Sequence, residues 1–226
     1  MKWVTLWSVD LDATGVDSDR WLDWVDEAER RQADRFVNPR DGRRFLARRA
    51  ARRAVLAAEL KLPIQAVRFV AGIHGKPALA GPANVLQFNT THSAGRALIA
   101  TSLAGPLGLD LERHLPLGED LHRVSSAFNP SEQKSLAALP AELQTSAFFA
   151  LWTRKEALLK AVGLGLSRAL DSFVVPVDPG AVPQWFFLDP EASPWWLQSL
   201  SVGPGLSAAL ASTNRVRLDQ RDFSFS

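Results

Sequence analysis

Hydrophobic and polar residues alternate at two places along the chain, and each alternation opens a similar series of elements. Residues 3–9 read Trp-Val-Thr-Leu-Trp-Ser-Val, and residues 107–112 read Leu-Gly-Leu-Asp-Leu-Glu. A period of two is typical of a strand that buries one face. We therefore predict a strand at each place.

Helical periodicity follows each predicted strand. In the first half, alanines lie on one side of residues 41–60, while Arg44, Arg48 and Arg52 recur at four-residue spacing on the other, as on an amphipathic helix. Leu62-Pro63 ends this helix. Further helices are predicted near 21–36, 119–128, 130–138 and 145–162, and extended segments at 67–71, 85–88, 96–103, 172–177, 184–188, 195–202 and 205–211.

The order of these elements repeats in the two halves of the chain. Segment 94–102, Ala-Gly-Arg-Ala-Leu-Ile-Ala-Thr-Ser, resembles segment 205–213, Gly-Leu-Ser-Ala-Ala-Leu-Ala-Ser-Thr. We predict an α+β (α/β) fold of two similar subdomains related by a pseudo-twofold axis, each with a small, mostly antiparallel sheet packed on a long helix. Gly105-Pro106 breaks the chain, so the predicted halves are residues 1–104 and 105–226. The cleft between them is the expected active site, and because one chain supplies both walls we expect a monomer.

Composition limits the chemistry of the protein. The 226 residues include no cysteine, which excludes disulfides, thiol catalysis and zinc–thiolate sites. We find no secretory leader pattern and no apolar run of bilayer length, so we expect a cytoplasmic protein without a membrane partner. Net charge is only +2, yet ten arginines fall between residues 30 and 53. Such a cluster indicates an anionic ligand or partner, or simply a solvated helix face.

Two acidic motifs suggest a metal site. On the strand that begins at residue 107, Asp110 and Glu112 share one face, where like charges repel unless a cation lies between them. On the helix predicted at 145–162, Glu156 and Lys160 lie one turn apart. Alone, that pair is an ordinary ion pair worth about 0.2–0.5 kcal/mol. Together with the acidic strand, it indicates a magnesium site that handles phosphate chemistry.

The two acidic motifs, in this order, resemble those of the Sfp-type 4′-phosphopantetheinyl transferases. That family carries a Gly-x-Asp-x-Glu strand and, further along the chain, a Trp-x-x-Lys-Glu-x-x-x-Lys helix; here these are residues 108–112 and 152–160. The resemblance extends from about residue 36 to residue 175 and includes Gly-Leu-Gly-Leu at 163–166, His-Gly-Lys-Pro at 74–77 and Phe-Asn-Thr-Thr-His-Ser at 88–93.

The resemblance implies an enzyme that moves 4′-phosphopantetheine from coenzyme A to a serine of an apo acyl or peptidyl carrier protein and releases 3′,5′-ADP. It implies that Asp110, Glu112 and Glu156 ligate Mg²⁺, or Mn²⁺ in its place, and that Asp110, Glu156 and Lys160 are catalytic. Glu156 would take the serine proton, and Lys160 would stabilise or protonate the departing 3′,5′-ADP. Both Lys155 and Lys160 would contact phosphate.

Further residues are assigned to coenzyme A by the same resemblance. Those for its 3′-phosphate are Arg44, Arg53, Thr91 and His92. The loop Gly75-Lys76-Pro77 would touch adenine and phosphates, with a plain β-turn as the alternative. Segment 113–140 would dock the carrier protein, whose surface is acidic around its modified serine; Phe128, Leu136 and Leu139 are the expected apolar contacts, with packing in the core as the alternative.

Two other classes of protein compete with this interpretation. A magnesium-dependent enzyme acting on nucleotides would use the same carboxylates, but the sequence has no P-loop and no Rossmann glycine fingerprint. A nucleic-acid-binding protein would use the arginine-rich helix, but it would leave Asp110, Glu112 and Glu156 without a role. We therefore expect no nucleic-acid partner.

Overall fold

The computed structural model describes residues 2–12, 18–72, 75–163, 168–189 and 191–225. The first sheet has the strand order β10-β1-β5-β4. Its strands are β1 (Lys2–Asp10), β4 (Gln87–Ser93), β5 (Arg96–Ser102) and β10 (Val216–Phe223). Two helices, α1 (Glu27–Ala33) and α2 (Pro39–Leu60), and a small hairpin of β2 (Phe69–Ala71) and β3 (Pro77–Leu79) complete this side of the molecule.

The second sheet has the order β6-β9-β8-β7. Its strands are β6 (Leu107–Arg113), β7 (Gln184–Phe186), β8 (Trp195–Leu200) and β9 (Leu206–Ser212), and its helices are α3 (Leu121–Ser125), α4 (Pro130–Ala137) and α5 (Ala141–Val162). Short 3₁₀ turns lie at Ser18–Trp24, Ile64–Ala66, Gly81–Val85, Gly118–Asp120 and Leu170–Ser172.

The predicted duplication is confirmed by the strand orders. The antiparallel series β1-β5-β4 in the first sheet corresponds to the antiparallel series β6-β9-β8 in the second. The two segments that resemble each other in sequence form β5 and β9, which are equivalent strands. The fold is therefore the mixed α/β architecture of two small sheets with helices that the sequence predicted.

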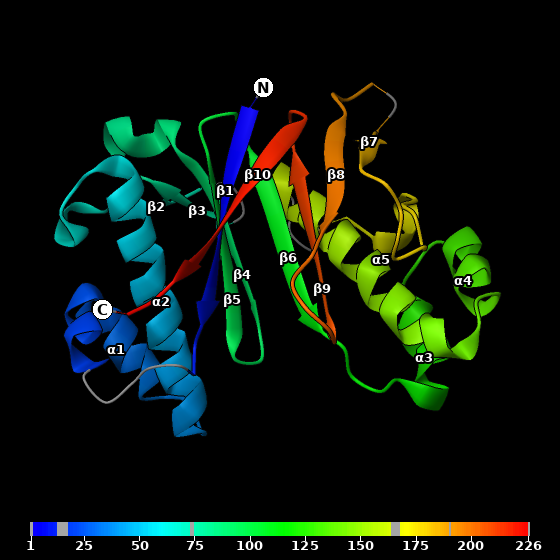
Figure 1. Cartoon of the computed structure of the whole chain (residues 1–226), viewed down its shortest axis with the longest axis horizontal. Coiled ribbons are helices and arrows are strands. Elements are labelled where there is room, and N and C mark those ends of the chain that lie inside the picture. The colour runs from blue at the N-terminus through cyan, green and yellow to red at the C-terminus, as the bar shows by residue number, and fades with distance from the viewer. Residues whose placement is uncertain (1, 13–17, 73–74, 164–167, 190, 226) are drawn as a thin grey trace.

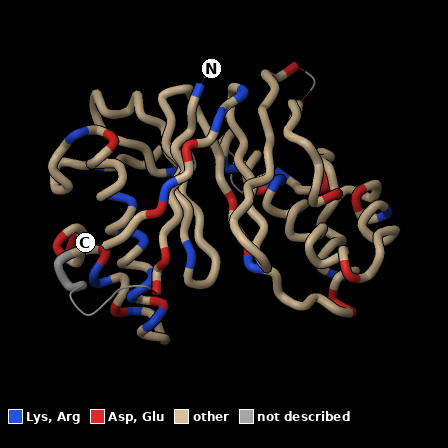
Figure 2. The backbone as a smooth tube through the Cα atoms, viewed as in Figure 1, with Lys and Arg blue, Asp and Glu red and all other residues tan. Residues whose placement is uncertain are grey.

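The two sheets lie face to face between α2 and α5, which gives four layers (Figure 1). Apolar residues fill all three interfaces, and strands in the middle are buried on both faces. On β5, Leu98 faces the second sheet whereas Ile99 packs under α2. On β9, Leu210 faces the first sheet whereas Ala209 packs under α5. Lys and Arg lie along α2 with Asp and Glu among them (Figure 2).

Local signals explain where the long helices begin and end. Helix α2 starts after Asn38, whose side chain accepts a hydrogen bond from the N–H of Arg40, and it ends at Lys61 in a left-handed conformation. Helix α5 ends at Gly163, whose φ of 81° is a conformation that glycine adopts without strain. No described helix combines the length and apolar character needed to cross a bilayer.

Several predicted boundaries are wrong. The helix predicted at 21–36 is a 3₁₀ turn followed by α1, because Asp26 and Glu29 form a capping box that starts a new helix. Strand β4 extends to Ser93 rather than ending at residue 88, since Thr91 and Ser93 place their hydroxyl groups against β6. Residues 173–177, predicted as a strand, belong to no regular element.

The last strand departs from the predicted division of the chain. Strand β10 pairs in parallel with β1, with Val216 opposite Lys2 and Phe223 opposite Val9. It therefore joins the sheet of residues 1–104 although it belongs to the predicted half 105–226. The sequence pattern of a strand does not state which edge it pairs with, so this connection was not predicted.

Candidate active site

The site is built where β6 and α5 touch. A Cβ atom on Gly108 would lie 2.0 Å from the carbonyl oxygen of Ala157 and 2.3 Å from the nitrogen of Ala161. Only glycine allows this approach. The close contact places Glu156 and Lys160, which immediately precede Ala157 and Ala161, beside the acidic strand.

Lys160 and Asp110 form the central ion pair of the site. The Lys160 Nζ lies 2.5 Å from Asp110 Oδ1, and Asp110 is buried. The other carboxylate oxygen of Asp110 and Oε1 of Glu156 are also buried, and neither has a hydrogen-bond partner among the described residues. Buried oxygens without partners are costly, which indicates that a further positively charged or donor group belongs here.

The pKa values of all three carboxyl groups, Asp110, Glu112 and Glu156, are raised. Burial raises the pKa of Asp110 above its ordinary value, even though Lys160 opposes the shift. Burial also raises the pKa of Glu112 and of Glu156, and the negative charge of Asp110 raises both further. The positive charge around the three carboxylates is therefore too small to offset their own negative charge.

The donor set fits a hard divalent cation in its chemistry. Carboxylate oxygens are the ligands that Mg²⁺ prefers, and two of them are unpartnered. In the described part of the chain, however, no three side chains of His, Cys, Asp or Glu are gathered closely enough to hold an ion. The ammonium of Lys160 instead takes one oxygen of Asp110, so a bound ion would require these side chains to rearrange.

Strand β4 lies beside β6 and contributes hydroxyl groups to the site. Thr91 is buried; its hydroxyl donates to Asp110 Oδ1 at 3.3 Å and accepts from the N–H of Leu111 at 3.2 Å. In this structure the Thr91 hydroxyl is used between the strands, and its contact with the 3′-phosphate stays a prediction. Ser93, which the sequence did not single out, occupies the corresponding position beside Glu112.

His92 lies on the other face of β4 and meets α2. Its Nδ1 is 3.3 Å from Nη1 of Arg48. Burial, with the positive charges of Arg48, Lys160 and Arg49, lowers the pKa of His92 to about 4 although part of its side chain remains exposed. Burial and the charge of Arg49 lower the pKa of Arg48 to about 10. The sequence predicted His92 but not Arg48, whose only signal was its four-residue spacing from other arginines.

The two arginines predicted for phosphate have acidic partners. Arg44 forms two hydrogen bonds with Asp12, at 2.8 Å from Nε and 2.6 Å from Nη2, and with Arg40 it holds the pKa of Asp12 well below its ordinary value. Arg53 pairs with Asp26 at 2.8 Å and also with Glu29, with its side chain 11% exposed. In this structure the Arg53 guanidinium joins α2 to α1, and its contact with the 3′-phosphate stays a prediction.

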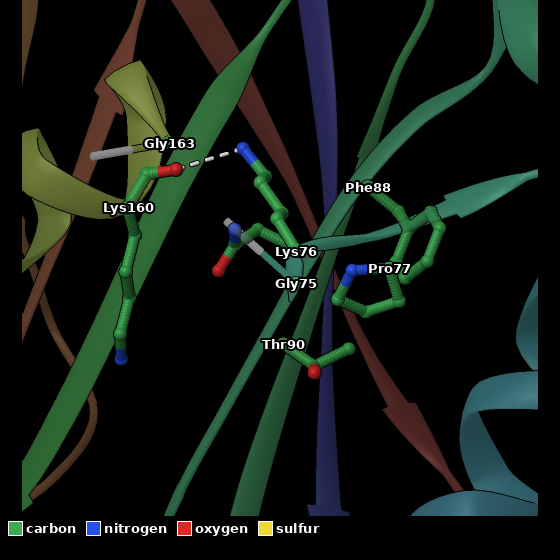
Figure 3. Close-up of a pocket in the computed structure, with 8 residues that line it drawn as sticks. Gly75, Lys76, Pro77, Phe88, Thr90, Lys160 and Gly163 are labelled. Atoms are coloured by element: carbon green, nitrogen blue, oxygen red, sulfur yellow. Dashed lines mark hydrogen bonds between the residues drawn. The ribbon is translucent and has the colours of Figure 1, made fainter. Parts of the chain in front are cut away.

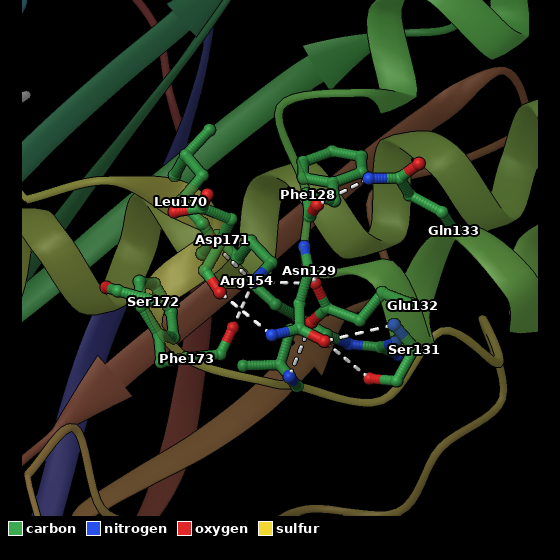
Figure 4. Close-up of polar contacts among 12 residues, drawn as sticks. Phe128, Asn129, Ser131, Glu132, Gln133, Arg154, Leu170, Asp171, Ser172 and Phe173 are labelled. Atoms are coloured by element: carbon green, nitrogen blue, oxygen red, sulfur yellow. Dashed lines mark hydrogen bonds and ion pairs between the residues drawn. The ribbon is translucent and has the colours of Figure 1, made fainter.

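Lys155 does not reach the site. Its side chain is fully buried, and Nζ lies 2.8 Å from Glu132 Oε2. The same ammonium donates to the carbonyl oxygens of Leu170 and Phe173; Figure 4 shows Glu132 and the segment Leu170–Phe173 that surround it. That Lys155 contacts phosphate stays a prediction, which its full burial and its partners in the core do not favour. Helical spacing points this lysine away from Glu156 and into the core.

A cavity of about 270 Å³ lies between the hairpin loop and the end of α5. It is lined by Gly75, Lys76, Pro77, Phe88, Asn89, Thr90, Lys160 and Gly163 (Figure 3). Lys76 Nζ donates to the carbonyl oxygens of Leu107 at 2.9 Å and Lys160 at 2.8 Å, and burial lowers the pKa of Lys76 to about 8. The loop predicted for coenzyme A thus lies beside Lys160, while His74 and residues 164–166 fall outside the described residues.

The segment predicted for carrier docking folds as α3 and α4. Phe128 and Leu136, two of its expected apolar contacts, are buried in the core with Leu139 packed against it, which is the alternative that the sequence left open. A cavity of about 520 Å³ is nevertheless formed here by residues that include Leu121, His122 and Lys134.

Comparisons with known proteins agree on one family. A family model described as the 4′-phosphopantetheinyl transferase superfamily matches residues 106–211, and one described as 4′-phosphopantetheinyl transferase, N-terminal, matches residues 14–104. The chain is 36% identical over 172 residues to a provisionally named 4′-phosphopantetheinyl transferase of Synechocystis sp., covering 76% of this chain and 70% of that protein.

Two further relatives carry the same activity in their names. The chain is 32% identical to the 4′-phosphopantetheinyl transferase HetI of Nostoc sp., with 82% of this chain and 81% of the relative covered. It is 29% identical to the 4′-phosphopantetheinyl transferase Sfp of Bacillus subtilis, with 88% and 86% covered.

Proposed function

The chain belongs to the 4′-phosphopantetheinyl transferase family, and from this premise we propose how it moves 4′-phosphopantetheine from coenzyme A to a carrier-protein serine. The observation that carries the proposal is the cluster of Asp110, Glu112, Glu156 and Lys160, with two buried carboxylate oxygens that lack partners. The family assignment does not favour a nucleotide hydrolase or a nucleic-acid-binding protein.

The cluster suits Mg²⁺ held by Asp110, Glu112 and Glu156. When bound, Mg²⁺ supplies positive charge to pyrophosphate oxygens. The unpartnered oxygens of Asp110 and Glu156 are the atoms most ready to act as ligands, and the raised pKa values of all three groups reflect the positive charge that the site lacks. Mn²⁺ would serve with the same ligands.

The proposed reaction is a displacement at phosphorus. Glu156, whose Oε1 is buried and has no hydrogen-bond partner among the described residues, takes the proton of the carrier serine hydroxyl as the general base. The serine oxygen forms a bond to the phosphorus that carries pantetheine, and the bond from this phosphorus to the bridging oxygen breaks. Lys160, beside Asp110, stabilises the charge that the departing 3′,5′-ADP gains, or supplies its proton.

Basic groups around this cluster form the proposed coenzyme A site. The cavity beside Gly75, Lys76 and Pro77 adjoins Lys160, which suits the pyrophosphate end of the nucleotide. Arg48 and His92, in contact at 3.3 Å, offer donors to a phosphate further along α2. Arg44 would also donate to this phosphate if the phosphate replaced Asp12 as the hydrogen-bond partner of Arg44.

The carrier protein would dock on α3 and α4. The cavity there combines apolar Leu121 with His122 and the charge of Lys134, which suits a helix with acidic residues around its serine. We further propose that the enzyme works as a monomer, because one chain supplies residues from both sheets to the site. We also propose that it works in the cytoplasm.

Transfer to a carrier is tested by mass. The protein, coenzyme A and Mg²⁺ are incubated with a panel of apo acyl and peptidyl carrier proteins, and each carrier is weighed intact. We expect the mass of one phosphopantetheine to be added to a serine, and the gain to disappear with EDTA or with Glu156→Gln. If no carrier gains mass, and coenzyme A with Mg²⁺ leaves the melting temperature unchanged, the proposed reaction is contradicted.

A further inference from the structure

The edges of the two sheets are joined by a repeating pattern of hydroxyl groups. Ser93 Oγ on β4 donates to Glu112 Oε2 at 2.9 Å and accepts from the N–H of Arg113 at 3.0 Å. Two residues earlier, Thr91 makes the same pair of contacts with Asp110 and the N–H of Leu111. Each hydroxyl therefore ties one carboxylate of β6 to the next backbone N–H of the same strand.

A hydroxyl is suited to this position because it both donates and accepts. The backbone carbonyl of a neighbouring strand would satisfy the N–H groups of β6 but would present no proton to a carboxylate. An alkyl side chain would satisfy neither. The side-chain hydroxyls of β4 thus bond both to the backbone N–H groups and to the carboxylates of β6, which backbone pairing of the two strands could not do.

The two carboxylates differ in how firmly they are held. Asp110 is restrained by Thr91 and also by Lys160 at 2.5 Å. Glu112 has a longer side chain and is half-buried, and among the described residues Ser93 provides the one hydrogen bond to its carboxylate. Loss of the Ser93 hydroxyl would leave Glu112 free to rotate, at a cost in conformational entropy when it binds a ligand.

We propose that Ser93 is a positioning residue that orients Glu112 for divalent cation binding. This inference rests on the proposed function, in which Glu112 is a ligand of Mg²⁺. Ser93 contacts neither the cation nor the reacting atoms; it acts through the carboxylate that it holds. Hydrogen-bond partners of metal ligands commonly change metal affinity or activity by about 10–100-fold when removed.

The test measures cation affinity directly. Mn²⁺ is titrated into the whole protein, and unbound Mn²⁺ is followed by electron paramagnetic resonance, with melting temperature recorded for each variant. We expect Ser93→Ala to weaken Mn²⁺ binding by about tenfold or more and to raise the Mg²⁺ concentration needed for half-maximal transfer, while KM for coenzyme A stays within about twofold. Ser93→Thr keeps the hydroxyl and is expected to bind Mn²⁺ nearly as the wild type does.

A matched control lies on the neighbouring strand. The Ser102 hydroxyl on β5 also joins backbone groups, donating to Trp3 and accepting from Ala104, but it bonds to no carboxylate of the described residues. Ser102→Ala is therefore expected to leave Mn²⁺ affinity unchanged. If Ser93→Ala does not fold, Ser93→Cys, with similar size and weaker hydrogen bonding, replaces it with the same expected direction.

Three results would overturn the inference. One is Mn²⁺ affinity in Ser93→Ala within about twofold of the wild type, and another is a loss in Ser93→Thr as large as in Ser93→Ala. The third is an equal loss in Ser102→Ala, which would mark a general effect on the sheet. A wild-type protein that transfers phosphopantetheine but binds no divalent cation would overturn this inference and the proposed Mg²⁺ ligands while leaving the transfer itself in place. Absence of transfer would instead contradict the proposed function.

Discussion

Gly108 on β6 and Ala157 on α5 are in backbone contact: a Cβ on Gly108 would lie 2.0 Å from the Ala157 carbonyl oxygen. Neither backbone can move away easily, because β6 is paired with β9 along its length and Ala157 lies within helix α5. This contact sets the distance between the acidic strand and the helix that carries Glu156.

Gly108→Ala is accordingly expected to destabilise the protein by about 3 kcal/mol or more. For a chain of this size the melting temperature would fall by about 6 °C or more. Gly180→Ala is the control, because the nearest atom to its added Cβ would be 3.4 Å away; we expect its change to stay within about 0.5 kcal/mol. Equal melting temperatures for Gly108→Ala and the wild type would contradict the contact.

The Glu156 carboxylate is expected to lower the stability of the metal-free protein. Because burial raises its pKa, the folded state binds this proton more tightly than the unfolded chain. Its contribution is therefore favourable at low pH and is lost as pH rises through the folded pKa. Glu156→Gln removes the charge, so at pH 8 without metal we expect a melting temperature about 1–4 °C above that of the wild type, together with loss of transfer.

Two further measurements check this prediction about Glu156. The difference in melting temperature should close as pH falls toward 4.5, the ordinary pKa of a glutamate, since both proteins are then uncharged at this position. Added Mg²⁺ should raise the melting temperature of the wild type more than that of Glu156→Gln. A variant less stable than the wild type at pH 8 without metal would show that the carboxylate has a favourable partner instead.

Arg48 and Arg53 lie on the same helix, and their substitutions should have opposite effects. Arg48 lies 3.3 Å from His92, and burial lowers its pKa to about 10, so Arg48→Met should not destabilise the protein. It should raise KM for coenzyme A by about tenfold or more, as expected for a lost charged hydrogen bond.

Arg53→Met should instead lower the melting temperature, because it leaves Glu29 with less positive charge in a site where the arginine side chain is 11% exposed. Its KM for coenzyme A should stay near that of the wild type. KM for coenzyme A is obtained from initial rates at saturating carrier protein, and the melting temperature from thermal unfolding. A raised KM for coenzyme A in Arg53→Met, with an unchanged melting temperature, would support the phosphate contact that the sequence predicted for Arg53.

Strand β10 is expected to be essential for the first sheet. It pairs with β1 over eight residues, and its Val216 is buried among core residues from both sheets. Removal of residues 216–226 should therefore cost about 3 kcal/mol or more and expose β1 to proteolysis. A peptide of residues 214–226 added in trans should protect the truncated protein again, and a peptide with Val216→Asp should not.

Limited proteolysis of β1 with mass mapping checks this outcome. An unchanged cleavage pattern after truncation would show that the first sheet does not depend on β10.

The sequence was sufficient for the architecture and for the family of the protein. Alternation at 107–112 and helical spacing at 145–162 are local patterns, so they determined the acidic strand, the helix of Glu156 and Lys160, and the repeat that became β5 and β9. Carboxylates that repel on one strand face are stabilised by a cation wherever the strand lies, so the prediction of a metal site required no tertiary structure.

Tertiary structure decided which groups face the site and which belong to the core. Thr91, Arg53 and Lys155 were all polar residues assigned to coenzyme A, yet each contacts a residue of a distant element: Asp110, Glu29 and Glu132 respectively. The roles of Ser93 and Arg48, and the pairing of β10 with β1, likewise depend on strands and helices that meet only after folding. Hydrogen bonds and ion pairs act over a few ångströms in space, and local sequence patterns do not specify which distant residues come within that range.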